Sequence, residues 1–134
     1  VIVPHSSTFE VFIQKQYKPG VKKVCYGFPA GFIKDGEQPI EAAKRELFEE
    51  AGVKAKVWKE VGTYFDNVSV SPAKFTIFFA SGLERAVIHP NPDIDEAKIM
   101  NLTVQAKTLK KYKMPGACMA LARELFLSSI SGKL

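Results

Sequence analysis

Residues 31–53 read GFIKDGEQPIEAAKRELFEEAGV, an acidic segment that ends in a glycine and a valine. The segment fits the template G-x5-E-x7-R-E-U-x-E-E-x-G-U, where U is an aliphatic residue, at every constrained position. At roughly 7% usage for each of the seven fixed letters, a chance match at one start point is on the order of one in 10^8. The match therefore indicates a functional site. The matching residues are Gly31, Glu37, Arg45, Glu46, Leu47, Glu49, Glu50, Gly52 and Val53.

Residues 39–51 are predicted to form one helix. Pro39 suits the first helical position, because the φ of proline is fixed and its missing N–H is not needed there. Gly52 follows as the expected end of the helix, since glycine readily adopts the conformation that closes a last turn.

The predicted helix brings carboxylates together. At 3.6 residues per turn, Glu46 and Glu50 lie one above the other, and Glu49 lies beside them. Like charges this close are unfavourable unless a positive group offsets them, and hard oxygen ligands suit Mg²⁺, with Mn²⁺ as an alternative. Arg45 and Glu49, four residues apart, are able to pair. The alternative is a solvated acidic helix face, which is the common situation for glutamates on an isolated helix.

The template is similar to the Nudix box, and the chain resembles a Nudix hydrolase, a family that cleaves nucleoside diphosphates linked to another group X. The resemblance implies a Nudix fold of the α/β (α+β) class, in which a mixed β-sheet is sandwiched between α-helices. We expect a single domain over residues 1–134, because a chain of this length buries one core but not two.

Several box residues are expected to hold a metal ion. We predict Glu46 and Glu50 as direct metal ligands and Glu49 as a further ligand or a bridge through water; Glu49 and Glu50 are also predicted to be catalytic. The resemblance adds the backbone carbonyl of Ala30 as a ligand, and glycine at position 31 leaves room for a close backbone approach. The predicted supporting residues are Gly31, Glu37 and Arg45.

The attacking water also needs a base, which the resemblance places on a loop late in the chain. Glu96 is the predicted base, because it ends an acidic loop just before an expected strand. Asp93, Asp95 and Glu84 are close enough in sequence to compete for this role. The alternative for Glu96 is an ordinary solvated loop acid.

The sequence on either side of the box resembles one branch of the family, which acts on ADP-ribose and nucleoside-diphosphate sugars. Lys15-Gln16-Tyr17-Lys18 is similar to an R-Q-Y-R segment of that branch, and Pro29-Ala30-Gly31 is similar to its P-A-G entry. Ser71-Pro72 lies where the branch carries a proline motif. The substrate-binding residues that this resemblance implies are Lys15, Gln16, Lys18, Ser71 and Pro72.

Three departures from the branch bear on the substrate. Lys15 and Lys18 replace two arginines, and so keep the charge but lose the planar fork that grips a diphosphate. Gly27 stands where the branch commonly has a glutamate. The N-terminal extension of the branch, which often helps to build its dimer, is absent from this chain, so we expect a homodimer of weaker or different geometry.

Composition favours a soluble cytoplasmic protein. The chain has 46% hydrophobic and 25% charged residues, and its net charge of +5 favours anionic partners such as nucleotides or RNA. Cys25 and Cys118 are the two cysteines and lack the spacing of a metal site, which favours a reducing compartment. No apolar run is long enough to span a bilayer.

Periodicity and turn residues predict the remaining elements. Strands are expected at residues 1–3, 9–17, 21–28, 53–65, 74–81 and 97–102, with an irregularity at Gly62 and a hairpin turn at residues 18–20. Further helices are expected at residues 104–112, capped by Thr103, and from Pro115 onward.

The favoured function is Mg²⁺-dependent hydrolysis of the diphosphate linkage in ADP-ribose or a nucleotide sugar, which yields a nucleoside monophosphate and a phosphorylated X group. One alternative is hydrolysis of RNA 5′ ends or dinucleoside polyphosphates, which the basic balance would suit. Another is a non-catalytic module that binds nucleotides or RNA, although such a module would be expected to lack a box glutamate, and none is missing here.

Overall fold

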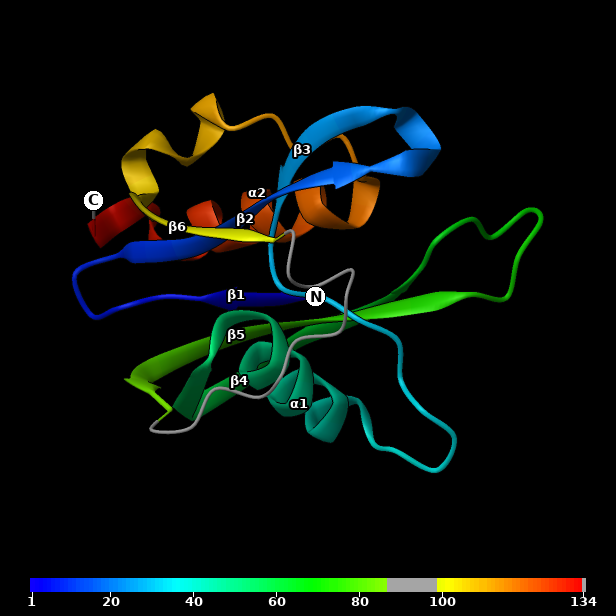
Figure 1. Ribbon diagram of the computed structural model, residues 1–134, viewed down its shortest axis with the longest axis horizontal. Coiled ribbons are helices and arrows are strands. Elements are labelled where there is room, and N and C mark those ends of the chain that lie inside the picture. The colour runs from blue at the N-terminus through cyan, green and yellow to red at the C-terminus, as the bar shows by residue number, and fades with distance from the viewer. Residues whose placement is uncertain (87–98, 134) are drawn as a thin grey trace.

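The structure is a computed structural model that describes residues 1–86 and 99–133 (Figure 1). Neither α1 nor α2, nor any shorter helix within those ranges, has the length and apolar character needed to cross a membrane. The strands are β1 (Ile2–Pro4), β2 (Glu10–Lys18), β3 (Lys23–Gly27), β4 (Val53–Phe65), β5 (Lys74–Arg85) and β6 (Met100–Gln105). The α-helices are α1 (Pro39–Ala51) and α2 (Ala117–Ile130), and the 3₁₀ turns are η1 (Pro19–Val21), η3 (Ala106–Lys111) and η4 (Ser131–Lys133).

The strands form two three-stranded sheets, which lie one above the other in Figure 1. The first sheet is mixed and has the order β1-β5-β4, with β1 parallel and β4 antiparallel to β5. The second sheet is antiparallel and has the order β3-β2-β6. The predicted mixed sheet between helices is therefore confirmed, and the second sheet adds a layer that the element order alone did not predict.

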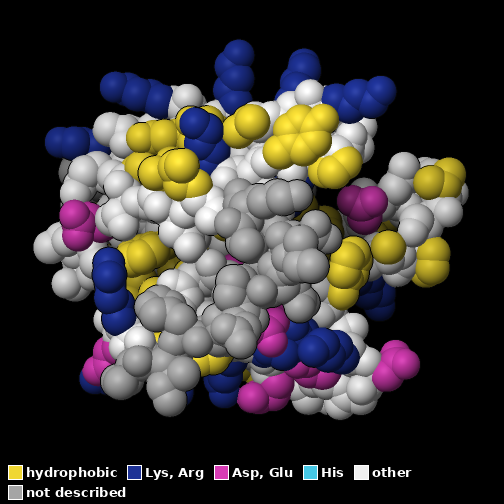
Figure 2. Space-filling view, viewed as in Figure 1, with side chains coloured by type: hydrophobic (Ala, Val, Ile, Leu, Met, Phe, Trp, Pro, Cys, Tyr) yellow, Lys and Arg dark blue, Asp and Glu magenta, His cyan; other side chains and the backbone are white. Residues whose placement is uncertain are grey.

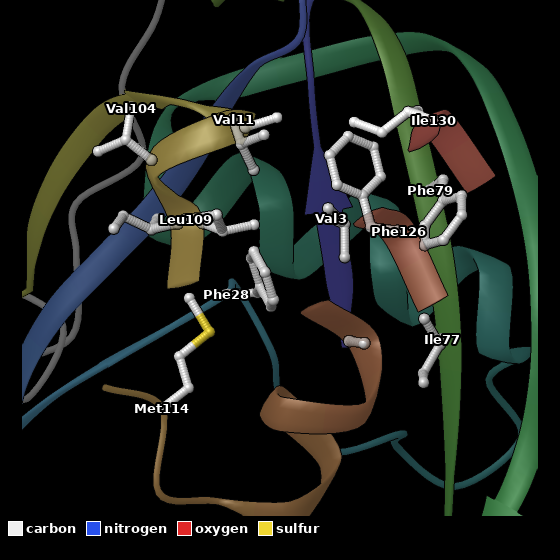
Figure 3. Packing of buried hydrophobic residues seen from close by; sticks show 13 residues of the cluster. Val3, Val11, Phe28, Ile77, Phe79, Val104, Leu109, Met114, Phe126 and Ile130 are labelled. Atoms are coloured by element: carbon white, nitrogen blue, oxygen red, sulfur yellow. The ribbon is translucent and has the colours of Figure 1, made fainter. Parts of the chain in front are cut away.

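Strand β5 is buried on both faces. Ile77 and Phe79 point into a core formed with the second sheet and α2, and their neighbours in that core include Val3, Phe28 and Phe126 (Figure 3). Phe78 and Ala80, which alternate with them along the strand, pack against Ala43 and Leu47 of α1. Helix α1 is thus held against the first sheet by an apolar stripe, which leaves its other side for the glutamates.

Helix α1 has the predicted bounds. Pro39 occupies its first turn, and Gly52 closes it in the left-handed conformation with φ of 62°. The N–H of Gly52 donates to the carbonyl of Phe48 at 2.9 Å, which satisfies one of the free carbonyls of the last turn. Strand β4 also has its predicted bounds and shifts register between Glu60 and Gly62.

The prediction for residues 104–112 is wrong in its first part. Val104 does not start a helix, because it pairs with Val11 in β6 and is buried in the core. Thr103 is a strand residue opposite Phe12 and not a cap, and only the 3₁₀ turn η3 follows. Burial of a β-branched side chain against β2 outweighs the local helical preference at this point.

Three other boundaries also differ. Strand β5 extends to Arg85, beyond the predicted end at residue 81, because β4 continues to pair with it as far as Val53. The hairpin of β2 and β3 is confirmed, but β3 begins at Lys23 after η1. Helix α2 begins at Ala117 after its cap Gly116, two residues later than predicted.

Phe126→Ala tests the core between α2 and the first sheet. The side chain of Phe126 is 1% exposed, and its ring lies edge-on to that of Phe79 at 5.4 Å. We expect the free energy of unfolding in urea to fall by about 3–5 kcal/mol, because the truncation leaves a cavity. The control is Phe32→Ala, whose side chain is 94% exposed and whose loss is expected to stay within about 0.5 kcal/mol. Equal losses for the two variants would contradict this packing.

Candidate active site

The box glutamates project from the C-terminal half of α1. Glu46 is buried at 8% exposure, although it carries a carboxylate, and Glu49 and Glu50 are half-buried. Buried carboxylates need partners, because removal from water penalises their charge. Arg45 and the backbone of the preceding loop supply those partners.

Arg45 joins the carboxylates into one cluster. Its Nη1 donates to Glu46 Oε1 at 2.5 Å and to Glu49 Oε2 at 3.1 Å. Its Nε and Nη2 donate to the two oxygens of Glu37, each at 2.9 Å, in a two-pronged pair. Nη2 also donates to the carbonyl of Phe32 at 3.0 Å, which fastens the loop before the helix to the same guanidinium. The predicted pairing of Arg45 with Glu49 is confirmed.

Arg45 changes the pKa of Glu37. Hydrogen bonds from Arg45, and then from the N–H of Lys34, lower the pKa of Glu37 from 4.5 to about 2. The same contact with Glu37 raises the pKa of Arg45 above its ordinary value. Because the pKa of Glu37 is lower in the folded state, this interaction stabilises the fold above about pH 4.5, and its contribution is lost as the pH falls towards 2.

Gly31 is required by a close approach. A Cβ atom at this position would overlap the carboxylate of Glu46, so the bare Cα lets that side chain lie across the loop. One residue earlier, the N–H of Ala30 donates to Glu50 Oε2 at 3.0 Å. The predicted group of Ala30, Gly31, Glu46 and Glu50 is therefore assembled at one point between the loop and α1.

Two residues that the sequence analysis did not single out connect this helix to the second sheet. Asn101 of β6 donates from Nδ2 to the backbone carbonyl of Glu50 at 3.0 Å. Gln14 of β2, which is 6% exposed, donates from Nε2 to Oδ1 of Asn101 at 3.4 Å. No sequence signal was available for them, because Gln14 and Asn101 lie 87 residues apart and belong to no motif.

The carboxylates suit a divalent ion by the chemistry of their donors. The carboxylate oxygens of Glu46, Glu49 and Glu50 are hard donors of the kind that a cation such as Mg²⁺ prefers. Among the residues described, no three acidic, histidine or cysteine side chains converge closely enough to enclose an ion by themselves. In this arrangement Arg45 offsets the negative charge of Glu46 and Glu49, so a bound ion would take over part of that role.

A cavity of about 520 Å³ opens beside these groups. Ala30, Gly31 and Glu46 line it together with Lys74 and Phe78 of β5. Its volume falls within the range of small-molecule sites. Figure 2 shows acidic side chains gathered around the position of α1 at the bottom of this face, with basic side chains beside them and others along the top edge.

The other predicted residues are distributed over three places. Gln16 and Lys18 lie at a second cavity beside the β2–β3 hairpin, where Lys18 Nζ donates to Gln16 Oε1 at 2.5 Å. Because side chains alternate along a strand, the side chain of Lys15 lies on the opposite face of β2 and does not line that cavity. Ser71 and Pro72 lie on the loop between β4 and β5, which projects from the body in Figure 1, and they line a shallow hollow of their own.

The candidate bases differ in position. Glu96, with Asp93 and Asp95, lies outside the described residues. Glu84 lies at the exposed end of β5, where it pairs with Lys56 at 2.5 Å, and it lines neither the cavity beside Glu46 nor that beside the hairpin.

The chain is similar to one protein family and to several known proteins. The family model of the NUDIX domain matches residues 1–115. An ADP-sugar pyrophosphatase of Mus musculus is 53% identical over 47 residues, which cover 35% of this chain and 22% of that protein. An ADP-ribose pyrophosphatase of Saccharomyces cerevisiae is 43% identical over 58 residues, which cover 43% of this chain and 25% of that protein. The matched segments thus span about a quarter of these curated relatives.

Among solved structures, an ADP compounds hydrolase superimposes with a TM-score of 0.77 at 23% sequence identity. The superposition covers 98% of this chain and 71% of that protein. At this level of identity the likeness concerns the fold.

Gly31→Ala tests the contact between the loop and Glu46. The added methyl group must displace the Glu46 carboxylate, so we expect affinity for Mg²⁺ or Mn²⁺ to fall about 10–100-fold while circular dichroism is unchanged. Titration calorimetry, or electron paramagnetic resonance with Mn²⁺, measures the affinity. Gly20→Ala is the matched control, because a Cβ at Gly20 has no atom within 4 Å. Unchanged affinity in Gly31→Ala would contradict the role given to Glu46.

Proposed function

The chain belongs to the Nudix family, and on that premise we propose that it is a pyrophosphatase that hydrolyses the diphosphate linkage of nucleoside diphosphate derivatives. ADP-ribose and nucleotide sugars are the favoured substrates, and the products are a nucleoside monophosphate and a phosphorylated X group. The names of the two curated relatives, ADP-sugar pyrophosphatase and ADP-ribose pyrophosphatase, support this choice.

One observation carries the proposal. The carboxylates of Glu37, Glu46 and Glu49 surround one guanidinium beside an open cavity, and Glu50 reaches the backbone at the same point. Three carboxylates around one guanidinium leave an excess of negative charge at this point. The excess of negative charge is suited to a cation, and the cavity leaves space for a substrate.

Members of this family generally use a divalent metal ion such as Mg²⁺. Glu46, Glu50 and the carbonyl of Ala30 would hold it, with Glu49 as a further ligand. When bound, such an ion neutralises the diphosphate and makes water more acidic. The residues of the chain orient the reaction: Arg45 holds the acidic side chains in place, and Gly31 admits the Glu46 carboxylate.

The substrate would bind beside the carboxylate cluster, where two cavities and basic side chains are available. Lys74 lines the cavity beside Glu46, and Lys18 lies at the neighbouring cavity, so each offers a positive group to a phosphate. Lysine provides a point charge and not a planar fork, which favours tolerance towards the group X. We also propose that the protein acts as a homodimer, in which the projecting loop of Ser71 and Pro72 would contribute to a site.

Glu50→Gln tests the catalytic assignment. We expect hydrolysis of ADP-ribose with Mg²⁺ to fall about 10²–10³-fold, because the neutral amide removes charge that stabilises the reacting centre. Glu41→Gln is the control, since Glu41 lies on the same helix, is exposed and pairs only with Lys44 among the described residues.

For the wild type, kcat/KM for ADP-ribose and several nucleotide sugars is expected to agree within about a hundredfold. Preference for a triphosphate or an RNA 5′ end by more than a thousandfold would contradict the proposed substrates.

Glu96→Gln tests the proposed general base. The loss of a base lowers kcat, while metal affinity stays within about twofold because the base does not hold the ion. Steady-state kinetics and metal titration on the same preparation separate the two effects. Greater damage from Glu84→Gln or Asp95→Asn would show that the base lies elsewhere.

A further inference from the structure

Charge is divided unevenly between the two layers of the molecule. Residues 11–28 and 99–123 supply most of the second sheet and the segment that leads from it into α2, and they contain nine basic residues and no acidic one. The whole chain has 19 basic and 14 acidic residues, so acidic residues are in excess in the rest of it. Figure 2 shows basic side chains projecting along the top edge of the molecule, above hydrophobic ones. A layer with this positive balance attracts polyanions.

One face of the second sheet carries exposed aromatic and apolar side chains. The register places Lys15 of β2 between Tyr26 of β3 and Met100 of β6. Residues paired across strands share a face, and Tyr17, two residues after Lys15, lies on this same face opposite Val24. These five residues define what we call the tyrosine face. Tyr17, Val24 and Met100 are 53%, 54% and 56% exposed, which makes the face accessible to a ligand.

Tyr26 is held in this face by the segment that follows η3. Its N–H donates to the carbonyl of Lys113 at 3.4 Å, and its ring lies edge-on to that of Tyr112, with the ring centroids 5.1 Å apart. Tyr17 lies diagonally across from Tyr26 in the β2–β3 register, a relation that separates two residues by about 7–8 Å. Two aromatic rings at this spacing are able to stack on neighbouring bases of an extended strand.

The tyrosine face points away from the carboxylate site. Gln14 lies on the other face of β2 and donates to Asn101, which donates to the backbone carbonyl of Glu50 in α1. Because side chains alternate along a strand, Lys15 and Tyr17 project to the side opposite this connection. A ligand on the tyrosine face therefore does not occupy the carboxylate site.

We propose that the tyrosine face binds single-stranded RNA, with bases stacked on Tyr17 and Tyr26 and a phosphate on Lys15. Aromatic side chains within a positively charged surface are the general means by which proteins bind single strands without sequence preference. A duplex fits less well, because its bases are already stacked on one another. A second copy of this chain is disfavoured, since two such basic faces would repel each other. RNA is favoured over DNA because the exposed tyrosine hydroxyl is able to hydrogen-bond a 2′-hydroxyl.

The first test measures the binding of a fluorescein-labelled oligouridine of about 12 nucleotides by fluorescence anisotropy in EDTA. We expect a dissociation constant between about 1 and 100 µM at low salt. Tyr17→Ala is expected to weaken binding about 5–100-fold, because one stacking surface is lost. Tyr17→Phe keeps the ring and is expected to stay within about threefold of the wild type.

Phe65→Ala is the matched control for Tyr17→Ala. Phe65 is 50% exposed, close to the value for Tyr17, but it belongs to β4 in the first sheet. Its replacement is expected to leave oligouridine affinity unchanged. The proposal is overturned if the wild type does not bind oligouridine, or if Phe65→Ala weakens binding as much as Tyr17→Ala does.

Salt dependence separates the contribution of charge from that of stacking. Each phosphate contact on a single strand adds about 0.7 to the slope of log affinity against log salt concentration. Lys15→Ala is expected to reduce the slope by about that amount, whereas Tyr17→Ala leaves it unchanged. Lys59→Ala is the control, because Lys59 is an exposed residue of β4 and its replacement changes the net charge equally. An equal reduction in Lys15→Ala and Lys59→Ala contradicts a phosphate contact at Lys15 and overturns the proposal.

Three further probes test the identity of the ligand. Oligodeoxyuridine lacks only the 2′-hydroxyls and is expected to bind at least about twofold more weakly; equal or tighter binding overturns the choice of RNA. Inorganic polyphosphate of equal charge has no bases and is expected to compete weakly, so equal competition would indicate a surface that recognises charge alone. Binding to phosphatidylserine vesicles without binding to oligouridine would indicate a lipid surface. Either of these last two results overturns the proposal.

The inference does not depend on the proposed hydrolysis, because RNA binding is measured without turnover. If ADP-ribose is hydrolysed with Mg²⁺ but oligouridine is not bound, the hydrolase assignment holds and the tyrosine face is wrong. If oligouridine is bound and Tyr17→Ala weakens it, but ADP-ribose is not hydrolysed, the tyrosine face is supported and the hydrolase assignment fails.

Discussion

The shared hydrogen bonding of Arg45 is the interaction on which the rest of the site depends. One guanidinium binds Glu37, Glu46 and Glu49 and also the carbonyl of Phe32, so it offsets the charge of the helix and anchors the loop that precedes it. Removal of such a partner leaves partly buried carboxylates uncompensated, which is far more costly than the loss of an exposed ion pair. Without Arg45, neither the burial of Glu46 nor the position of Gly31 against it would be favourable.

The two-sided burial of β5 gives this charged cluster a rigid base. One face of the strand holds α1 through Leu47, and the other face holds α2 through Phe126. The glutamates therefore project from a helix whose opposite side is fixed in a core. Asn101 adds a polar connection from the second sheet to the last turn of that helix.

Agreement between sequence and structure depends on how local each feature is. The bounds of α1 followed from Pro39 and Gly52, and the pairing of Arg45 with Glu49 followed from a spacing of four residues. The sequence predicts a helix at Val104, yet its strand partner Val11 lies more than 90 residues earlier in the chain. Residues 15–18 are continuous in the sequence, whereas the alternation of side chains along β2 separates Lys15 from Gln16 and Lys18.

The sequence by itself determined the family, the acidic helix and the identity of its carboxylates, because these depend on residue types at short, regular spacings along one helix. Only the tertiary structure decided which residues that are separated in the sequence lie together. These are Gly31 against Glu46, Asn101 against the carbonyl of Glu50, and Gly27 opposite Gln14. For the residues on strands, the physical reason is register. A shift of one residue between paired strands turns every side chain to the other face, and the sequence of either strand alone does not specify that alignment. The register of β2 and β3, for example, leaves Gln14 opposite Gly27, which has no side chain.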